Sequence, residues 1–360
     1  FFIFLFIHFS LPKRLPFEAP PIPNDENRNK FPTLIIFKSA RTGSTWLSGL
    51  LKISRDSISE KKKLMVVHEC VGCGRNSQNG FQEYIRQASQ RQLKMFENHS
   101  NCQKWTPKSH CCPDKLENET ESEYFSNHVG TVLTMQPFHE PGPLLPEQWN
   151  RILNESDNQI YFCVYKRINL VKWAVAKLRE KLLVLRCSTG KKVDASNIAC
   201  LSKLNGTMYA DPNQLRSIMV SGWFMQQKQK LLAQRLAEGT GHAVSTLTYE
   251  QLQVDARRHL TRVLEPMALS GGVTLLGQTN YAKITSNNLR DVLSNFDEVA
   301  ADLSAFPCFH AQLLEVTPNV DGECELPQQF HPAKMQEALD LLRQIDNDKQ
   351  LVHLKMHLNE

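Results

Sequence analysis

Short apolar runs alternate along the chain with longer stretches in which apolar residues recur at helical spacing. The runs are rich in β-branched or bulky side chains and predict strands at residues 34–37, 64–68, 160–165 and 243–248. The longer stretches predict helices from residue 44 onward and at residues 170–185, 212–236, 255–267 and 286–306. Because strands and helices alternate, we expect an α/β fold in which a parallel sheet is flanked by helices on both faces.

One junction between a strand and a helix carries a dense set of small and polar residues. The segment at residues 31–51 reads FPTLIIFKSARTGSTWLSGLL, with Gly43 at the turn and Ser44 opening the helix. Glycine permits a tight turn, and the free N–H groups and positive dipole end of the helix point into the loop. The pattern therefore predicts a phosphate-binding loop. It lacks the early Gly and the Lys of the GxxxxGK[ST] nucleotide-triphosphatase loop, and Arg41 supplies the cation instead.

This loop resembles the donor-binding loop of the sulfotransferase superfamily, K/R-[ST]-G-[ST]-T-[WYF]-L, and its pattern is nearest to carbohydrate and bacterial-type members. The matching residues are Arg41, Thr42, Gly43, Ser44, Thr45, Trp46 and Leu47. The resemblance implies a P-loop nucleotide-binding fold and the donor 3′-phosphoadenosine 5′-phosphosulfate (PAPS). It also implies that the loop holds the 5′-phosphate, and that Arg41 stabilises charge on the bridging oxygen as the sulfuryl group leaves.

A second segment, residues 159–179 (QIYFCVYKRINLVKWAVAKLR), has the same plan of strand, polar loop and helix. It resembles the superfamily's 3′-phosphate motif, in which an Arg at the strand end and a Ser in the following helix grip the 3′-phosphate. Arg167 matches the Arg, but Ala176 stands at the Ser position. Three interpretations of this departure remain open. Lys172 or Arg179 replaces the missing ligand to the 3′-phosphate, the affinity for the donor is reduced, or this protein is impaired as an enzyme.

Two later stretches extend the resemblance. Residues 243–252 (AVSTLTYEQL) resemble a recurrent strand that ends in YExL, and residues 281–303 resemble the C-terminal segment of bacterial, algal and carbohydrate sulfotransferases. In related enzymes residues of that last segment lie near the nucleotide. This implies Lys283 as a nucleotide-binding candidate and Asn295 as a capping or packing residue.

A general base is needed to deprotonate the acceptor hydroxyl, and no metal is required for sulfuryl transfer. Carbohydrate relatives commonly use a carboxylate after the second strand, where this chain has His68 and Glu69. Side chains of successive strand residues point to opposite faces, so we expect only one of the two to face the site, and we favour Glu69. His139 and Glu140, in a Pro-rich loop, are the next candidates.

Composition sets the class of protein and its partners. The chain has 360 residues, of which 41% are hydrophobic and 22% charged, as in a soluble globular protein, and its formal net charge is +5. This mild charge favours anionic donors and acidic glycans, and no basic stripe indicates nucleic-acid binding. The resemblance implies a sulfotransferase domain at residues 31–314, with an insertion at about 70–128 and a C-terminal extension at 315–360. It also implies a hydroxyl acceptor, which we expect on a glycan, with tyrosine and a lipid headgroup sugar as alternatives.

The N-terminal run FFIFLFIHFSLPKRLPF is apolar and is followed by a Pro-rich segment. It reads as the remnant of a membrane anchor and stem at residues 1–30, which predicts a single-pass type II membrane protein of the Golgi lumen. A truncated signal peptide of a secreted protein and a plain hydrophobic strand are the alternatives.

Ten cysteines fit an oxidising compartment, and glycosylation sequons at Asn98, Asn118, Asn154 and Asn205 fit it too. Cys308 and Cys324 bracket a turn-rich loop and predict a local disulfide, whereas Cys163 lies in an apolar run and predicts a buried free thiol. Five of the other seven cysteines lie in the predicted insertion. Cys102, Cys111 and Cys112 predict disulfides that brace it, and Cys70 and Cys73 could instead form a zinc site with Cys111 and Cys112, which their spacing fits less well.

Two other functions remain open at this level. A nucleotide kinase of the P-loop type fits the first loop apart from the missing GK[ST]. A catalytically silent homologue that binds PAPS or its product is suggested by Ala176.

Overall fold

The computed structural model divides into two compact units, Phe1–Lys30 and Phe31–Glu360, and every residue described below belongs to the second. The described residues are 32–39, 42–59, 61–68, 127–138, 149, 153, 160–187, 207–267, 269, 272–277, 279 and 286–347. Most of the predicted insertion at about 70–128 and all of the predicted anchor and stem lie outside them.

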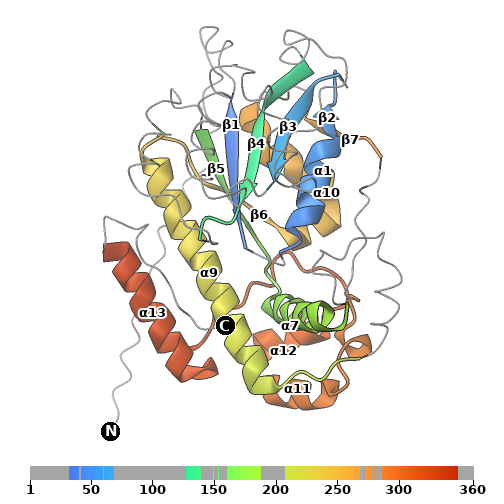
Figure 1. Cartoon of the computed structure of the whole chain (residues 1–360), viewed down its shortest axis with the longest axis vertical. Coiled ribbons are helices and arrows are strands. Elements are labelled where there is room, and N and C mark those ends of the chain that lie inside the picture. The colour runs from blue at the N-terminus through green and yellow to red at the C-terminus, as the bar shows by residue number, and fades with distance from the viewer. Residues whose placement is uncertain are drawn as a thin grey trace. The chain divides into compact units, whose positions relative to one another are not determined.

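The centre of this unit is a seven-stranded sheet with the order β6-β5-β1-β4-β3-β2-β7 (Figure 1). Its strands are β1 (Thr33–Lys38), β2 (Ser54–Asp56), β3 (Lys63–His68), β4 (His128–Met135), β5 (Ile160–Lys166), β6 (Ser245–Thr248) and β7 (Val273–Leu275). β1 pairs in parallel with β4 and β5, and the β3–β4 and β5–β6 pairs are parallel too. β2 is antiparallel to both of its neighbours, so in the described sheet it alone runs against the rest. The prediction of a mostly parallel α/β sheet is confirmed.

Seven α-helices are described in this unit, together with three short 3₁₀ turns, η4 (Glu265–Met267), η5 (Leu289–Asp291) and η6 (Gln328–Phe330). The helices are α1 (Ser44–Ile53), α7 (Leu170–Cys187), α9 (Pro212–Glu238), α10 (Tyr249–Val263), α11 (Phe296–Leu303), α12 (Pro307–Leu314) and α13 (Pro332–Asn347). Within the described part of the chain, no helix combines the length and the apolar character needed to cross a bilayer.

The helices cover the sheet because strand side chains alternate between its faces. Leu34 and Ile36 of β1 share one core with apolar residues of α1 and α10. The alternate residue Phe37 contacts the rings of Trp149 and Phe162 on the other face, along which α9 packs against β1 and β5. α10 contacts both β6 and β7, which are the two edges of the sheet, so the sheet is curled.

A second core lies among the helices beyond the sheet. It joins α7, the first half of α9, α11, α12 and α13, which lie together at one end of the sheet in Figure 1. Trp173 of α7 packs against Gly222 of α9 so closely that a Cβ on Gly222 would lie 2.5 Å from its ring. This helical layer brings α12 against α7 and the turn that follows β5, which matters for the site below.

Two of the predicted elements differ from the structure. The helix predicted at residues 286–306 is wrong in its first half, because the backbone around Leu293 pairs with Met208 and Asn295 binds both backbone groups of Ala210. Asparagine side chains that bond to backbone compete with a helix in this way. The helix predicted at residues 255–267 begins earlier, at Tyr249, because Thr248 and Gln251 form a capping box.

Candidate functional site

The two loops that the sequence selects lie at neighbouring strand ends. From β1 the chain passes through α1 to strands on the β3 side, and from β5 it passes through α7 and α9 to β6 on the opposite side. The connections therefore diverge between β1 and β5, which is a topological switch point of the sheet. Ligands of open α/β sheets bind at the carboxyl ends of the strands at such a point.

The first turn, residues 42–46, is shaped by Gly43. Its φ of 81° and ψ of 24° place it in the left-handed region, where side chains other than that of glycine are disfavoured. A Cβ at this position would lie 2.4 Å from Cδ2 of Tyr249 and 3.3 Å from the hydroxyl of Tyr165. The hydroxyl of Thr42 donates to the carbonyl of Ser39 at 2.8 Å. The turn is thus fixed by backbone conformation and by two aromatic rings that leave no room for a side chain.

The amino end of α1 has the groups that bind an anion. No side chain of the described residues caps this helix, so its first N–H groups keep the donor capacity that a cap would use. Next to it, the hydroxyl of Tyr165 is fully buried and has no hydrogen-bond partner among the described residues. Burial raises the pKa of Tyr165 well above its usual range, so this phenol stays protonated at neutral pH.

Tyr249 connects the first turn with the end of β5. Its ring lies edge-on to that of Trp46, with 5.4 Å between the centroids, and packs against Gly43. The guanidinium carbon of Arg167 lies 4.8 Å from the centre of the same ring. The predicted loop residues 42–46 and the predicted Arg167, far apart in sequence, are therefore brought together through Tyr249.

Arg167 differs from the two cations that flank it in sequence. Lys166 pairs with Glu323 at 2.6 Å and Lys172 pairs with Glu315 at 3.2 Å, so both ammonium groups are engaged. Arg167 is 7% exposed, and its Nε lies 3.9 Å from the nearest carboxylate oxygen. This Nε has no hydrogen-bond partner among the described residues. A buried donor in this state is costly unless something else accepts from it, which fits an anionic ligand.

The carboxylate near Arg167 belongs to Glu250, and it is engaged elsewhere. One oxygen accepts from the N–H of Ile168 at 2.9 Å, and the other accepts from the N–H of Asn169 at 3.1 Å. Glu250 is 2% exposed, so these bonds satisfy a buried charge. Its main effect is to hold the turn after β5, residues 167–169. The YExL stretch was identified by resemblance without a role, and the structure gives roles to both Tyr249 and Glu250.

The departure at Ala176 can be placed in α7. Ala176 is partly buried there, and Lys172, one residue expected to compensate for it, pairs with Glu315. Burial lowers the pKa of Lys172, and Glu315 opposes that shift. Lys172 is thus part of the polar network of the second turn in this structure. Arg179, the other such residue, is partly buried in α7, and burial lowers its pKa.

Several predicted site residues fall outside the described part of the chain. They are Arg41, Glu69, Lys283, His139 and Glu140. His68 ends β3, where its backbone lies in register with Thr134 of β4, but its side chain is not described. The assignment of the base therefore stays a prediction. The sequons and the cysteines at residues 70, 73, 102, 111 and 112 also lie outside the described residues.

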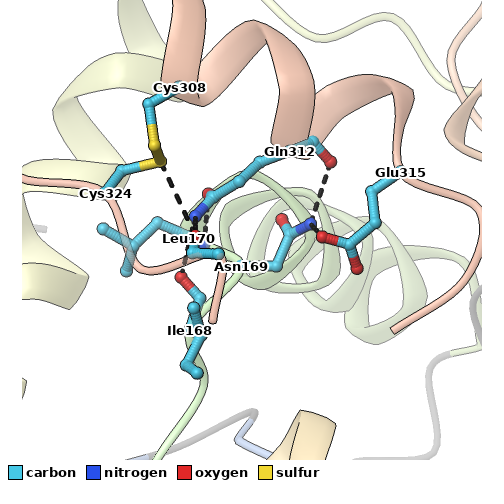
Figure 2. Close-up of a disulfide and its surroundings, with 8 residues drawn as sticks. Ile168, Asn169, Leu170, Cys308, Gln312, Glu315 and Cys324 are labelled. Carbon is cyan, nitrogen blue, oxygen red and sulfur yellow. Dashed lines mark hydrogen bonds between the residues drawn. A yellow bond between two sulfur atoms is a disulfide. The ribbon is translucent and has the colours of Figure 1, made fainter. Parts of the chain in front are cut away.

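The predicted disulfide between Cys308 and Cys324 is present (Figure 2). Cys163 is a free thiol buried in β5, as expected, and burial raises its pKa to about 12. Among the described residues no group of three or more His, Cys, Asp and Glu side chains is placed to hold a metal ion.

Sequence reasoning missed three further residues that shape the site. The hydroxyl of Tyr165 lies beside Gly43, and Gln226 of α9 and Gln312 of α12 bind the backbone of the turn after β5. No local pattern marks them for these roles, because the roles depend on where the fold places the side chains. Comparison with protein-family models, with curated proteins and with solved structures finds no match.

Proposed function

We propose that this chain is a PAPS-dependent sulfotransferase with a nucleotide-binding site of the P-loop type. The observation that carries the proposal is the convergence of the Gly43 turn and Arg167 on the Tyr249 ring, at the switch point of the sheet. Two separate sites for anionic groups, joined by one aromatic residue, suit a nucleotide that carries phosphate on both its 5′ and its 3′ oxygen.

The turn at residues 42–46 would receive the 5′-phosphate on the N–H groups at the start of α1. Arg167 would donate to the 3′-phosphate through the guanidinium that lacks a close carboxylate partner. Arg41 would lie beside the bridging oxygen, and Lys283 would contact the nucleotide. Each of these assignments uses a cation or a backbone donor where the ligand carries negative charge.

PAPS supplies the sulfuryl group in this reaction. The protein holds the acceptor hydroxyl in line with the sulfur while a base, Glu69 before His68, takes the hydroxyl proton. A bond forms between the acceptor oxygen and sulfur, the bond from sulfur to the bridging oxygen breaks, and the nucleotide leaves as the bisphosphate. Arg41 and the N–H groups of the turn stabilise the charge that develops on the leaving phosphate.

We propose a glycan as the acceptor and the Golgi lumen as the compartment, with the N-terminal segment as a single-pass anchor. The disulfide between Cys308 and Cys324 supports an oxidising compartment, since such bonds are rare in the cytosol. A secreted form of the same enzyme is the alternative. Tyrosine and a lipid headgroup sugar remain alternative acceptors.

A catalytically silent homologue is the second candidate function, because Ala176 stands where the superfamily has a Ser ligand to the 3′-phosphate. Such a protein would bind adenosine 3′,5′-bisphosphate without transferring sulfate. A nucleotide kinase is the third candidate, and it would hydrolyse or transfer phosphate from ATP.

The test is transfer of labelled sulfate from PAPS to a panel of desulfated glycans, with Arg41→Ala as the paired variant. We expect transfer by the wild type and a loss on the order of 10²–10³ in rate for the variant. Tight binding of the bisphosphate without transfer to any acceptor would favour the silent homologue. Phosphoryl transfer from ATP without sulfate transfer would favour the kinase.

A further inference from the structure

The turn after β5 is bound from one side by a single glutamine of α12. The side-chain oxygen of Gln312 accepts from the N–H of Leu170 at 2.9 Å, and its nitrogen donates to the carbonyl of Ile168 at 3.1 Å. The same nitrogen donates to the carbonyl of Gly322 at 2.7 Å. Gln312 is 3% exposed, so this amide connects two backbone segments in a buried setting. Figure 2 shows it between Ile168, Leu170 and the disulfide.

The disulfide holds the second of those segments in place. Cys308 and Gln312 are four residues apart on α12, so their side chains share one face of the helix. Cys324, bonded to Cys308, stands two residues after Gly322. Between them, Glu323 pairs with Lys166, the residue immediately before Arg167. The disulfide-bonded segment at residues 308–324, which we call the clamp, therefore contacts the chain on both sides of Arg167.

A further residue of the clamp extends these contacts into α7. Glu315 accepts from the side-chain amide of Asn169 at 3.1 Å and from the ammonium group of Lys172 at 3.2 Å. Asn169 also donates to the backbone carbonyl of Gln312 at 2.8 Å. The backbone of this turn is also held by Glu250 of α10 and by Gln226 of α9, whose side-chain nitrogen donates to the carbonyl of Arg167 at 3.0 Å.

We infer that the clamp sets the position of Arg167 for the 3′-phosphate, with Gln312 as the positioning residue. The inference rests on the proposed function, since the 3′-phosphate is the ligand named there. Its physical basis is that the guanidinium of Arg167 has only a distant carboxylate, 3.9 Å away on Glu250, and the Tyr249 ring beside it. The position of the backbone that carries Arg167 therefore decides whether its free donor reaches the phosphate. That backbone is held on one flank by Lys166–Glu323 and on the other by Ile168–Gln312. The clamp thus confers affinity for one phosphate without touching it.

The test compares two nucleotides on one variant. Gln312→Leu keeps the size of the side chain and removes its three hydrogen bonds. We expect affinity for adenosine 3′,5′-bisphosphate to fall by about tenfold. Affinity for adenosine 5′-phosphate, which lacks the group that Arg167 would bind, should change less than twofold. Titration calorimetry on the full chain measures both.

The matched control is Phe309→Leu, on the same helix. Phe309 is buried against Phe330, with 4.7 Å between the ring centroids, so its truncation costs packing energy without touching the turn. It should lower the melting temperature and leave the ratio of the two affinities unchanged. An equal change in the ratio for both variants would mean that Gln312 acts only through general stability.

A second measurement covers the case in which Gln312→Leu does not fold. In the wild type, mild reduction of the disulfide, or the paired change Cys308→Ser and Cys324→Ser, should speed hydrogen exchange at the amides of Ile168, Asn169 and Leu170. It should also lower affinity for the bisphosphate alone. Unchanged exchange and unchanged affinity after reduction would overturn the inference.

The 3′-phosphate site and the clamp can be disproved separately. If the wild type binds neither nucleotide, or if Arg167→Ala weakens both nucleotides equally, the proposed site for the 3′-phosphate falls and the clamp's role falls with it. If Arg167→Ala affects the bisphosphate selectively while Gln312→Leu and reduction do not, only the clamp is wrong.

Discussion

The turns after β1 and after β5 occupy neighbouring positions at the same edge of the sheet, yet they are held in different ways. The first depends on one left-handed glycine and on the rings of Tyr249 and Tyr165 packed against it. The second depends on hydrogen bonds from side chains that arrive from three helices: Gln226 of α9, Glu250 of α10 and Gln312 of α12. One turn is specified by its own sequence and by packing, the other by partners remote in the chain.

This difference bears on what each turn can bind. Backbone N–H groups at a helix start are fixed as soon as the turn forms, so the first site needs no side chain to present its donors. A guanidinium on a flexible side chain must be held in position to bind a phosphate. Arg167 stands on a turn whose backbone is hydrogen-bonded by the side chains of Glu250, Gln226 and Gln312. We therefore expect different responses to mutation. The first turn should be disrupted by added side-chain volume, and the second by the loss of hydrogen bonds to its backbone.

The largest effect is expected from Gly43→Ala. The variant forces a side chain into the left-handed region, which costs about 1–3 kcal/mol of stability. It also drives a Cβ into the ring of Tyr249, and this overpacking costs about 1–3 kcal/mol more. Either the turn deforms or the ring moves, and Tyr249 cannot move without disturbing Arg167. We expect a drop of about 3–5 kcal/mol in the free energy of unfolding, measured by urea denaturation, and loss of binding to both nucleotides.

Gly241→Ala is the matched control for this variant. Gly241 has a φ of 71°, but no atom lies within 4 Å of where its Cβ would stand. It carries the conformational strain without the clash, so it should cost about 1 kcal/mol and leave nucleotide binding intact. Equal costs for the two variants would show that the rings do not shape the first turn.

The second largest effect is expected from Arg167→Ala. A charge-assisted hydrogen bond lost to a ligand typically costs about 1.5–3 kcal/mol, so affinity for adenosine 3′,5′-bisphosphate should fall roughly 10- to 150-fold. Affinity for adenosine 5′-phosphate should hardly change, and calorimetry with both ligands separates the two outcomes. Arg290→Ala is the control, because it removes an exposed guanidinium that pairs with Asp297 and that neither turn uses.

Ala176→Ser tests the proposed 3′-phosphate site by adding a hydrogen-bond donor, where Arg167→Ala removes one. If the position on α7 faces the 3′-phosphate, the added hydroxyl should tighten the bisphosphate by about 1 kcal/mol. No gain would mean that the polar network around the second turn has taken over what the Ser does in the superfamily.

The difference between the two turns also explains which of their features could be predicted from the sequence. The strand, turn and helix around Gly43 could be predicted because the apolar run, the glycine and the helix start are contiguous, and the glycine is needed for a local reason. Arg167 could be found by its place at the end of an apolar strand. Its surroundings could not, because Glu250 and Gln312 become neighbours only after the helices pack.

The fold shows the same limit. Most helices and the strands β1, β3, β5 and β6 match their predicted positions, since periodicity is a property of the segment itself. β4 (His128–Met135) was not predicted, although it pairs with β1 along its length. It begins where the predicted polar and Cys-rich insertion ends, so its first residues were assigned to the insertion and its apolar run was not recognised as a strand. The break before α11 was missed because Met208, far away in sequence, takes the backbone bonds that a helix would need.

Two buried lysines should respond to substitution by Met with opposite changes in the free energy of unfolding, because only one of them has a carboxylate partner among the described residues. Lys172→Met leaves Glu315 without its cation in a mostly buried network, and should cost about 2 kcal/mol of unfolding free energy. Lys228 of α9 is 2% exposed, lies 3.8 Å over the ring of Phe138 and pairs with no described carboxylate. Lys228→Met should therefore stabilise the protein at neutral pH by about 1–3 kcal/mol.

The pH dependence identifies the cause of that gain. Burial lowers the pKa of Lys228 to about 8 from an ordinary value of 10.5. Between these values the unfolded chain binds a proton that the folded chain does not, so wild-type stability rises with pH through this window. The advantage of Lys228→Met should be complete below pH 8 and shrink as pH approaches 10.5. A constant advantage across that window would attribute it to packing instead of charge.

The smallest effect is expected from Tyr165→Phe, and it is the sharpest test of how the first turn is held. The hydroxyl of Tyr165 is fully buried without a described hydrogen-bond partner, and because burial raises its pKa it stays neutral, so phenylalanine reproduces everything except the oxygen. Removing an unsatisfied buried hydroxyl costs no hydrogen bond, and the void it leaves is small. Unfolding free energy should change by less than about 1 kcal/mol, and it should rise if the desolvation cost of the hydroxyl outweighs the lost contacts. Nucleotide affinity should stay within about twofold of the wild type. Tyr249→Phe, which removes a hydroxyl that accepts from Gln253, is the matched variant and should cost more. If Tyr165→Phe lost 2 kcal/mol or more, the hydroxyl would have a partner in the folded protein. The first turn would then rest on hydrogen bonds as the second does, and the contrast between them would fail.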